Sequence, residues 1–314
     1  MTLANRHRRN GKPKAVDHVP LWMPERVFVA RENQLTDRAA SLFANGASLS
    51  CLVVGDSKSV LSQFPVAAFQ CCVTSPPYWS LRNYHIAGQI GLELSVKEYI
   101  QNLVMVFEHV RRVLREDGTL WLNIGDSYTS GGRTWRAPDK KNPVRAMDIR
   151  PPTPEGLKPK DLIGVPWRLA FALQEAGWYL RADIIWNKPN CQPESVKDRP
   201  TRCHEYLFLF SKNERYLYDS KALRGPNERN LRTVWDINTQ AYKGAHFATF
   251  PPAVVEPCLT LGSREGDLVL DPFIGSGTTG LVALNMNRRF VGVELNPAYI
   301  QIAEKRLNGA IIHE

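Results

Sequence analysis

The chain has 314 residues, of which 43% are hydrophobic and 23% charged, as in a soluble globular protein with one large or two ordinary domains. No apolar run approaches the ~20 residues that span a bilayer, and no signal-peptide core is present, so a cytoplasmic protein without membrane contact is expected. Six cysteines without a paired Cys-x-x-Cys spacing argue against a disulfide framework and against a metal site.

The basic charge is concentrated at the N-terminus. The net charge is +9, and the first fourteen positions carry five basic residues with no acid, namely Arg6, Arg8, Arg9, Lys12 and Lys14. Such an arm suits a polyanion partner through counterion release, and a solubilising tail would have the same composition. Nucleic acid is therefore a plausible partner class, which charge alone does not establish.

Seven short apolar segments are predicted to be strands. Several of them lack polar alternation, which is typical of strands covered on both faces. They are Leu52–Val54, Phe69–Thr74, Leu120–Ile124, Asp183–Trp186, Tyr206–Phe210, Leu268–Leu270 and Phe290–Val293.

Helical patterns alternate with these strands. Ser95 and Glu98 form a capping-box pattern before an apolar stripe. A second helix is predicted from Pro166 to a stop at Gly177, and a third begins at Asn296 with proline at its first position. This alternation predicts an α/β fold with a mainly parallel, doubly wound sheet.

Two stretches interrupt the alternation. Residues 128–160 are rich in proline and basic residues, and a structureless segment of this length indicates a functional or mobile loop. Residues 213–244 are also loop-like and place several arginines near aromatic residues.

A glycine pattern follows the strand near the C-terminus. Gly275, Gly277 and Gly280 fit Gly-x-Gly-x-x-Gly, and Glu294 ends the next predicted strand. Glycines let the backbone turn tightly against a ligand, and a carboxylate on the neighbouring strand binds ribose hydroxyls. The pattern fits NAD as well as S-adenosylmethionine. A dinucleotide-binding domain would need a second mononucleotide-binding half after the glycine turn, and the chain after Gly280 is too short for one.

A stiff polar tip follows the strand that ends at Thr74. Pro76 and Pro77 fix the backbone and aim the Ser75 hydroxyl and nearby carbonyls outward. Acceptors held in this way suit a flat exocyclic amino group, and Tyr78 offers a face on which a base rotated out of a duplex can stack. A proline-stiffened turn with a packing aromatic is the alternative.

Together these segments resemble the amino-group DNA methyltransferases, the N4-cytosine and N6-adenine enzymes, in their permuted arrangement with the catalytic half first. Residues 271–277 are similar to the family's S-adenosylmethionine motif and residues 74–79 to its catalytic motif. Residues 54–56 are similar to the strand end that contacts the cofactor's adenine. Residues 246–251 resemble the segment over its methionine end, and residues 186–190 a wall of the target-base pocket.

The resemblance implies a circularly permuted methyltransferase domain over residues 51–314, preceded by a basic arm and lead-in over residues 1–50. It implies catalytic roles for Ser75, Pro76, Pro77 and Tyr78. It implies S-adenosylmethionine as cofactor and no metal, with cofactor contacts from Asp56, Phe250, Asp271, Phe273, Gly275, Ser276, Gly277, Thr278 and Glu294.

The expected partners are double-stranded DNA and a cognate restriction endonuclease. A target-recognition region is expected over residues 196–245, with Arg224, Arg229 and Arg232 holding DNA phosphates or, as the alternative, reading guanines in the major groove. A serine at position 75 favours cytosine N4 as the target over adenine N6. A nicotinamide-dependent oxidoreductase and a non-catalytic nucleic-acid-binding protein are the other classes considered.

Overall fold

The computed structural model describes residues 27–35, 42–44, 49–130, 135–137, 146, 150–240 and 250–309. Within these ranges nine strands form a single sheet in the order β1-β2-β9-β8-β3-β4-β6-β5-β7. The strands are β1 (Val27–Arg31), β2 (Ser50–Val54), β3 (Phe69–Thr74), β4 (Leu114–Ile124), β5 (Tyr179–Asn187), β6 (His204–Ser211), β7 (Val234–Asp236), β8 (Leu268–Asp271) and β9 (Arg289–Glu294). Neighbouring strands from β1 to β4 pair in parallel, whereas β6 runs antiparallel to both β4 and β5.

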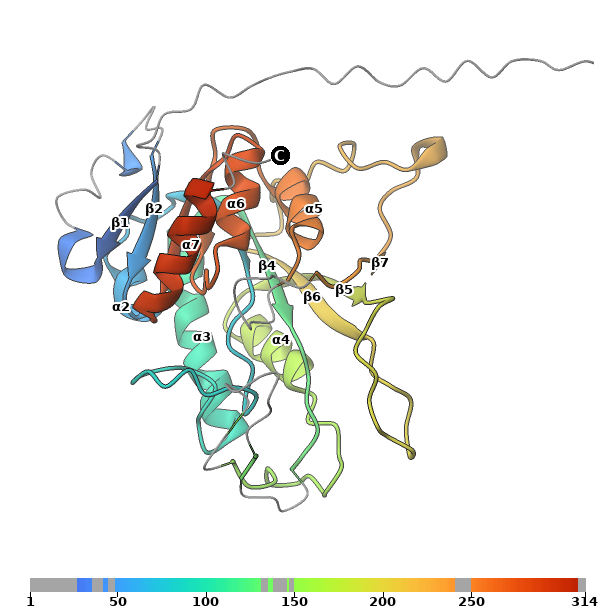
Figure 1. The fold of residues 1–314 in the computed structure, drawn as a ribbon. Coiled ribbons are helices and arrows are strands. Elements are labelled where there is room, and N and C mark those ends of the chain that lie inside the picture. Colours follow the sequence, from blue (N-terminus) through green and yellow to red (C-terminus); the bar gives the residue numbers. More distant parts are fainter. Residues whose placement is uncertain are drawn as a thin grey trace, which may run out of the picture.

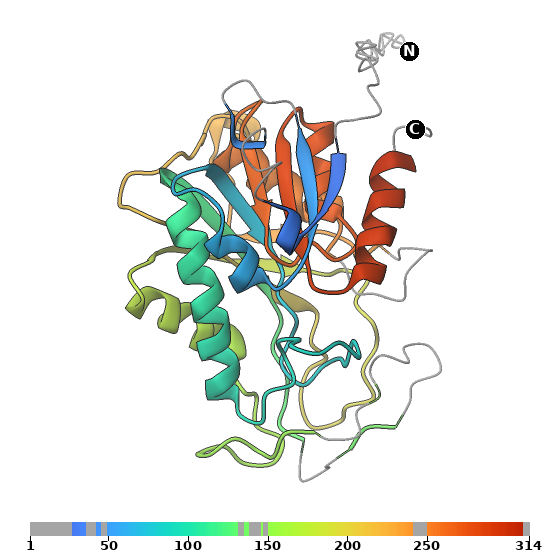
Figure 2. The same cartoon turned by 90° about the vertical axis from the view of Figure 1, so that its left-hand side faces the viewer.

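Helices cover both faces of the sheet (Figures 1 and 2). One face carries α2 (Ser57–Ser62), α3 (Val96–Val113) and α4 (Val165–Glu175) over one hydrophobic core. The other face carries α5 (Pro252–Gly262), α6 (Thr278–Asn285) and α7 (Pro297–Gly309) over a second core. Short 3-10 turns occur at Glu32–Gln34 and Pro226–Glu228. The prediction of a mainly parallel sheet covered on both faces is confirmed.

The helix ends follow the sequence signals. Ser95 Oγ accepts a hydrogen bond from the backbone N–H of Glu98, whose carboxylate accepts the N–H of Ser95, so the capping box forms (3.2 Å for both contacts). Asn296 Oδ1 accepts the N–H of Ala298 at 3.0 Å at the start of α7. These side chains satisfy backbone donors that have no partner within their own helix.

The seven predicted strands all form, most of them longer by a few residues at their ends. Strands β1 and β7 and helices α2 and α5 were not predicted. The edge strand β7 is three residues long and shows no recognisable periodicity, and α5 contains Pro257, which reads as a break.

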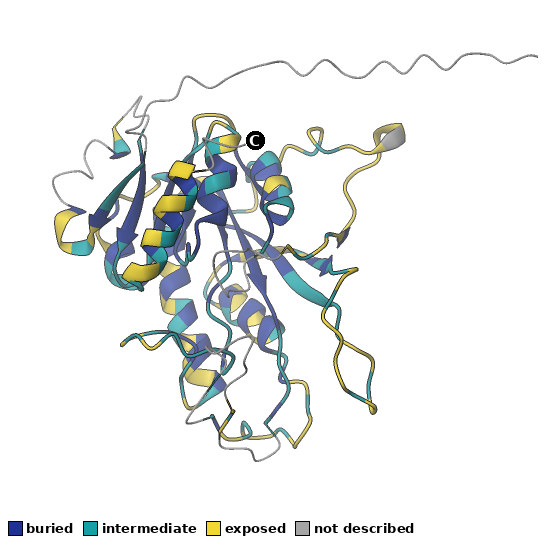
Figure 3. Cartoon of the chain, viewed as in Figure 1, coloured by how far each residue is buried: buried dark blue, intermediate teal, exposed yellow. Residues whose placement is uncertain are grey.

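The central strands of the sheet are buried, whereas β1, β5 and β7 at its edges and most connections are intermediate or exposed (Figure 3). The described part of residues 128–160 contains no helix or strand, apart from isolated bridge residues at Tyr128, which pairs with Leu162, and at Arg136. Of the basic arm and lead-in predicted over residues 1–50, residues 1–26, 36–41 and 45–48 lie outside the described residues. Across the described ranges, no helix has the length and apolar character needed to cross a bilayer.

Candidate active site

Two distant segments meet at the carboxyl edge of the sheet. Strands β3 and β8 are hydrogen-bonded neighbours, with Cys72 opposite Leu270, so Thr74 and Asp271 end them side by side. The Thr74 hydroxyl donates to Asp271 Oδ1 at 2.6 Å across 197 positions of sequence. One cavity of about 370 Å³ is lined by both Ser75 and Gly275. The polar tip and the glycine turn therefore face the same space, as the sequence predicts.

The Asp271 carboxylate joins the two segments. Its Oδ1 accepts from Thr74 and from the N–H of Phe273, and its Oδ2 accepts the hydroxyl of Thr279 at 2.7 Å. Burial raises its pKa to about 6. Since both oxygens are bonded within the protein, we infer that Asp271 positions the turn rather than contacting the cofactor through its carboxylate.

This arrangement predicts the effect of Thr74→Val. The substitution keeps the shape of the side chain but removes one donor to a buried carboxylate oxygen, so the free energy of unfolding is expected to fall by about 1–3 kcal/mol. Urea denaturation measures the change. Thr260→Val is the matched control, because the Thr260 hydroxyl donates to the Glu256 carbonyl in its own helix. Equal losses in both variants would contradict the inference.

The glycines of the turn have different tasks. Gly275 and Gly277 adopt positive φ angles of 51° and 87°, which side-chain-bearing residues rarely adopt. Gly280 lies in α6, where an added Cβ would lie 2.8 Å from the Phe290 ring. The first two glycines shape the turn, and the third allows α6 to pack on β9.

Glu294 ends β9 beside this turn and lines the cavity. Its Oε2 accepts the N–H of Gly275 at 3.1 Å, and its Oε1 accepts the N–H of Asn296 at 2.8 Å. Burial raises its pKa to about 7, although these hydrogen bonds oppose the change. A desolvated carboxylate at this position suits a ligand that offers hydroxyl donors.

Of the other predicted cofactor residues, Asp56, Phe250, Asp271, Phe273, Ser276 and Thr278 line the same cavity, whereas Gly277 does not. Asp56 Oδ1 also accepts the N–H of Ser59 and so caps α2. Residues 246–249 of the predicted covering segment lie outside the described residues.

Three residues at or beside this part of the cavity were not identified from the sequence. Arg306 of α7 donates to the hydroxyls of Ser276 and Thr278 at 3.1 and 2.9 Å. Tyr84 and Tyr299 line the cavity, with ring centroids 5.8 Å apart and an edge-to-face geometry. A carboxylate, aromatic faces and open backbone around one cavity fit a nucleoside-containing ligand such as S-adenosylmethionine.

The predicted catalytic residues Ser75, Pro76, Pro77 and Tyr78 all line the cavity. The Tyr99 hydroxyl donates to the Pro77 carbonyl at 2.8 Å and so anchors the tip. The Tyr78 ring packs on Gly125, where an added Cβ would lie 2.6 Å from the ring. The backbone at Gly125 therefore covers part of the ring that we expected to be free for stacking.

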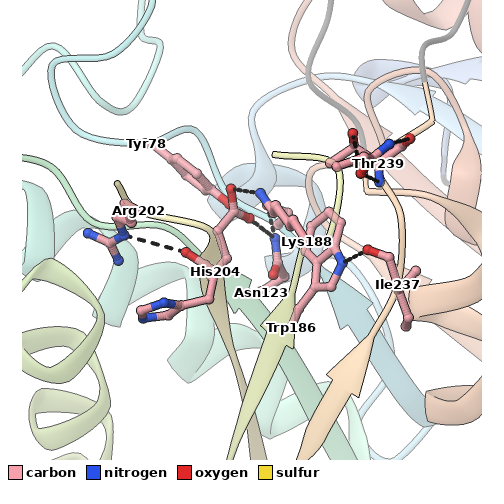
Figure 4. Close-up of polar contacts among 11 residues, drawn as sticks. Tyr78, Asn123, Trp186, Lys188, Arg202, His204, Ile237 and Thr239 are labelled. Carbon is pink, nitrogen blue, oxygen red and sulfur yellow. Dashed lines mark hydrogen bonds and ion pairs between the residues drawn. The ribbon is translucent and has the colours of Figure 1, made fainter. Parts of the chain in front are cut away.

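A polar cluster behind the tip was also missed. The Tyr78 hydroxyl donates to Glu205 Oε2 at 2.7 Å, and Asn123 Nδ2 lies 3.1 Å from the same oxygen. Lys188 forms an ion pair with Glu205 and lies with its Nζ 4.1 Å from the centroid of the Trp186 ring. Figure 4 shows Tyr78, Asn123 and Lys188 converging from three segments of the chain. Of residues 186–190, which the resemblance implies as a wall of the target-base pocket, Trp186 and Lys188 line the cavity.

The three predicted DNA-contacting arginines lie elsewhere. Arg224, Arg229 and Arg232 belong to the connection that precedes β7 and projects from the sheet (Figure 1). They do not line the cavity, and Arg224 pairs with Glu228 at 2.7 Å. Cys191, Cys203 and His204 form no metal-binding group with other described residues.

Comparisons with known proteins agree with this geometry. The DNA methylase family of N6 and N4 methyltransferases matches residues 69–305. The chain is 60% identical over 264 residues to the type II methyltransferase M.XycI of Xanthomonas campestris pv. cyanopsidis, covering 83% of this chain and 88% of that protein. It is 59% identical over 276 residues to the type II methyltransferase M.Cfr9I of Citrobacter freundii, covering 87% and 91%.

Solved structures share the fold. The PvuII DNA methyltransferase (cytosine-N4-specific) superposes with a TM-score of 0.62 at 22% identity, over 84% of this chain and 86% of that chain. A putative DNA modification methylase from Thermus thermophilus, complexed with S-adenosyl-L-methionine, gives a TM-score of 0.59 at 27% identity, over 84% and 95%. The cavity, its two motifs and these matches establish that the chain belongs to the DNA methylase family of N6 and N4 methyltransferases.

Proposed function

We propose that this chain transfers a methyl group to the exocyclic N4 of cytosine in double-stranded DNA. The cofactor is S-adenosylmethionine, which would supply an electrophilic methyl group on sulfur and leave as the neutral thioether S-adenosylhomocysteine, while the methylated nitrogen loses one proton to solvent. The observation that carries the proposal is the single cavity lined by Ser75 on one side and by Gly275 and Glu294 on the other. A base that enters beside Ser75 lies next to the cofactor's binding residues.

The residues of the tip have a chemical task in this reaction. An exocyclic amino nitrogen is a poor nucleophile because its lone pair is delocalised into the ring. Acceptors at Ser75 and the neighbouring carbonyls hold both N–H hydrogens and favour a tetrahedral nitrogen with a free lone pair. Catalysis then rests on positioning and electrostatics. Because an amino group inside a duplex is out of reach, the base rotates out of the stack, with Tyr78 and Trp186 as candidate walls.

The preference for cytosine rests on Ser75, since the resemblance associates serine at this position with cytosine and aspartate with adenine. Adenine N6 is the alternative target. Incubation with labelled S-adenosylmethionine and duplex DNA, followed by digestion to nucleosides, distinguishes them. Label in 4-methylcytosine is the expected result, label in N6-methyladenine would reassign the target, and no label in DNA would refute the function.

We further propose that Arg224, Arg229 and Arg232 bind DNA phosphates within a target-recognition region over residues 196–245. Replacing all three with alanine is expected to reduce the slope of log affinity against log salt by about 2 to 3, close to 0.9 for each lost phosphate contact. Fluorescence anisotropy across a salt series measures this slope.

An Arg→Lys triple variant should retain the slope, because lysine also binds phosphate. Lys305→Ala, an exposed position on α7, is the control. An unchanged slope in the alanine variant would contradict the assignment.

The order of the motifs supports a permuted arrangement, because the catalytic tip on β3 precedes the cofactor turn after β8. One sheet can be cut at different loops when its termini lie close together. The expected basic, proline-rich loop over residues 128–160 stays a prediction, because residues 131–134, 138–145 and 147–149 lie outside the described residues. We also propose a cytoplasmic role with a cognate restriction endonuclease, whose cleavage of the shared sequence should be blocked after treatment of DNA with this protein.

A further inference from the structure

A second cavity lies beside the catalytic tip. It has a volume of about 230 Å³, and its wall includes residues 79–81, which directly follow the tip in the chain. Leu81 also lines the first cavity, the one that Ser75 and Gly275 share. The two cavities are therefore neighbours with a common wall. None of the residues predicted for catalysis or cofactor binding lines the second cavity.

The wall of the second cavity carries an excess of positive charge. Its described residues include three arginines and two carboxylates. The arginines are Arg136, Arg150 and Arg202, and the carboxylates are Asp126 and Glu194. A hollow lined in this way attracts an anion.

The two carboxylates are engaged elsewhere in the fold. Asp126 Oδ1 accepts the backbone N–H groups of Gly164 and Val165, both at 3.0 Å, and so holds the start of α4. Glu194 Oε2 accepts a hydrogen bond from Arg199 Nη1 at 2.7 Å, and Arg199 does not line the cavity. Because these oxygens already have donors, the carboxylates neutralise the three arginines of the wall only in part.

Arg202 has a donor that lacks an acceptor. Its side chain is 15% exposed, and its Nε donates to the His204 carbonyl at 3.4 Å (Figure 4). Its Nη1 is buried, donates no hydrogen bond to any described residue and lies 3.8 Å from Asp126 Oδ2. A buried donor without an acceptor is costly, and native structures contain few of them. An anionic oxygen in the cavity supplies the missing acceptor.

From these observations we propose that the second cavity binds a DNA phosphate that flanks the target nucleotide, with Arg202 as its main donor. A base that enters the first cavity brings its own sugar and phosphates to the rim, next to the shared wall at Leu81. A guanidinium suits phosphate because its planar fork forms parallel hydrogen bonds with two oxygens. This role rests on the proposed function, which supplies the DNA and the rotated base.

The wall between the cavities is held from both of its sides. Arg136 Nη1 donates to the Leu81 carbonyl at 3.1 Å, and the Ser80 N–H donates to the Gly91 carbonyl at 2.8 Å. A phosphate in the second cavity therefore has a fixed position relative to the tip. Phosphate contacts set the register of a protein on DNA and carry no direct sequence information. The expected effect of this site is thus on DNA affinity and not on the choice of base.

Arg202→Gln is the first test. It is expected to weaken binding of duplex DNA about 10- to 100-fold, the range for a hydrogen bond to a charged group, and to reduce the slope of log affinity against log salt by about 0.9. The affinity for S-adenosylmethionine should stay within about twofold of wild type, because Arg202 does not line the first cavity. Arg264→Gln is the matched control, since this exposed arginine lies between α5 and β8, at the opposite edge of the sheet. Equal DNA affinities of Arg202→Gln and wild type would overturn the proposal.

A neutral phosphate on the DNA side gives the second test. Once the methylated base is mapped, duplexes are made in which one of the two phosphates that flank it is a methylphosphonate. One of these duplexes is expected to bind wild type about 10-fold or more weakly, but Arg202→Gln less than about twofold more weakly than unmodified DNA, because the contact is already lost. Arg150→Gln, which leaves the ion pair of Arg202 with Asp126 in place, is expected to show the same pattern.

Equal methylphosphonate losses in wild type and both variants would overturn the proposal, since the arginines would then act through folding or through another part of the DNA. Absence of methylation by the wild-type protein would instead refute the proposed function.

Discussion

Replacing Ser75 with alanine is expected to lower kcat about 100- to 1,000-fold, comparable to the loss of one preorganised electrostatic contact in other active sites. Ser75 lines the cavity from the tip after β3, whereas the residues expected to hold the cofactor come from the ends of β2, β8 and β9, their loops and the segment before α5. The affinity for S-adenosylmethionine should therefore change less than about twofold. Single-turnover methylation and titration calorimetry measure the two quantities on the same preparation.

The control for this variant is Ser62→Ala. The Ser62 hydroxyl donates to the Ser59 carbonyl within α2 and lies away from the cavity. This control tests whether removing a serine hydroxyl away from the cavity also lowers kcat or cofactor affinity. Equal losses of turnover and cofactor affinity in Ser75→Ala would assign Ser75 to folding or cofactor binding instead of catalysis.

The juxtaposition of the two motifs was predictable from sequence for a physical reason. Both follow short apolar strands, and parallel strands in a doubly wound sheet end at the same edge, where ligands bind. Ser75 and Gly275 therefore had to face one rim if both strands belonged to one parallel sheet. The glycine turn alone did not exclude a nicotinamide cofactor, because its backbone geometry suits either cofactor. Membership of the DNA methylase family excludes that alternative.

The cluster behind the tip was not predictable in the same way. Glu205 and Asn123 are 82 positions apart and meet because β6 inserts antiparallel between β4 and β5. Hydrophobic periodicity identifies a strand but does not give its neighbours or its direction. One signal was present, since Asn123 interrupts an apolar run in β4 and is buried there. A buried amide needs partners, but the sequence does not name them.

Replacing Glu294 with glutamine is expected to weaken S-adenosylmethionine binding about 100-fold, because an ionised carboxylate accepts ribose hydroxyls more strongly than an amide does. The same substitution should change the pH dependence of binding. Burial raises the pKa of Glu294 to about 7, so in the wild type the affinity is expected to rise as pH increases from 6 to 8 and the carboxylate ionises. The variant has no charge at this position and should show a flatter profile. Calorimetric titrations across this pH range measure both effects.

The free energy of unfolding of the wild type should show the opposite pH dependence, falling as the affinity for S-adenosylmethionine rises. A carboxyl whose pKa is raised on folding binds its proton more tightly in the native state, so its contribution to stability is present below the unfolded pKa and is lost as pH rises towards 7. The stability of Glu294→Gln relative to wild type is therefore expected to increase by about 1–3 kcal/mol between pH 5 and pH 8. Urea denaturation without cofactor measures this difference, with Glu304→Gln, an exposed carboxylate on α7, as the control. A variant that loses cofactor affinity while its relative stability rises with pH would show that this buried charge is retained for binding at the expense of folding. A pH-independent difference in stability would show that Glu294 is not held in a desolvated state.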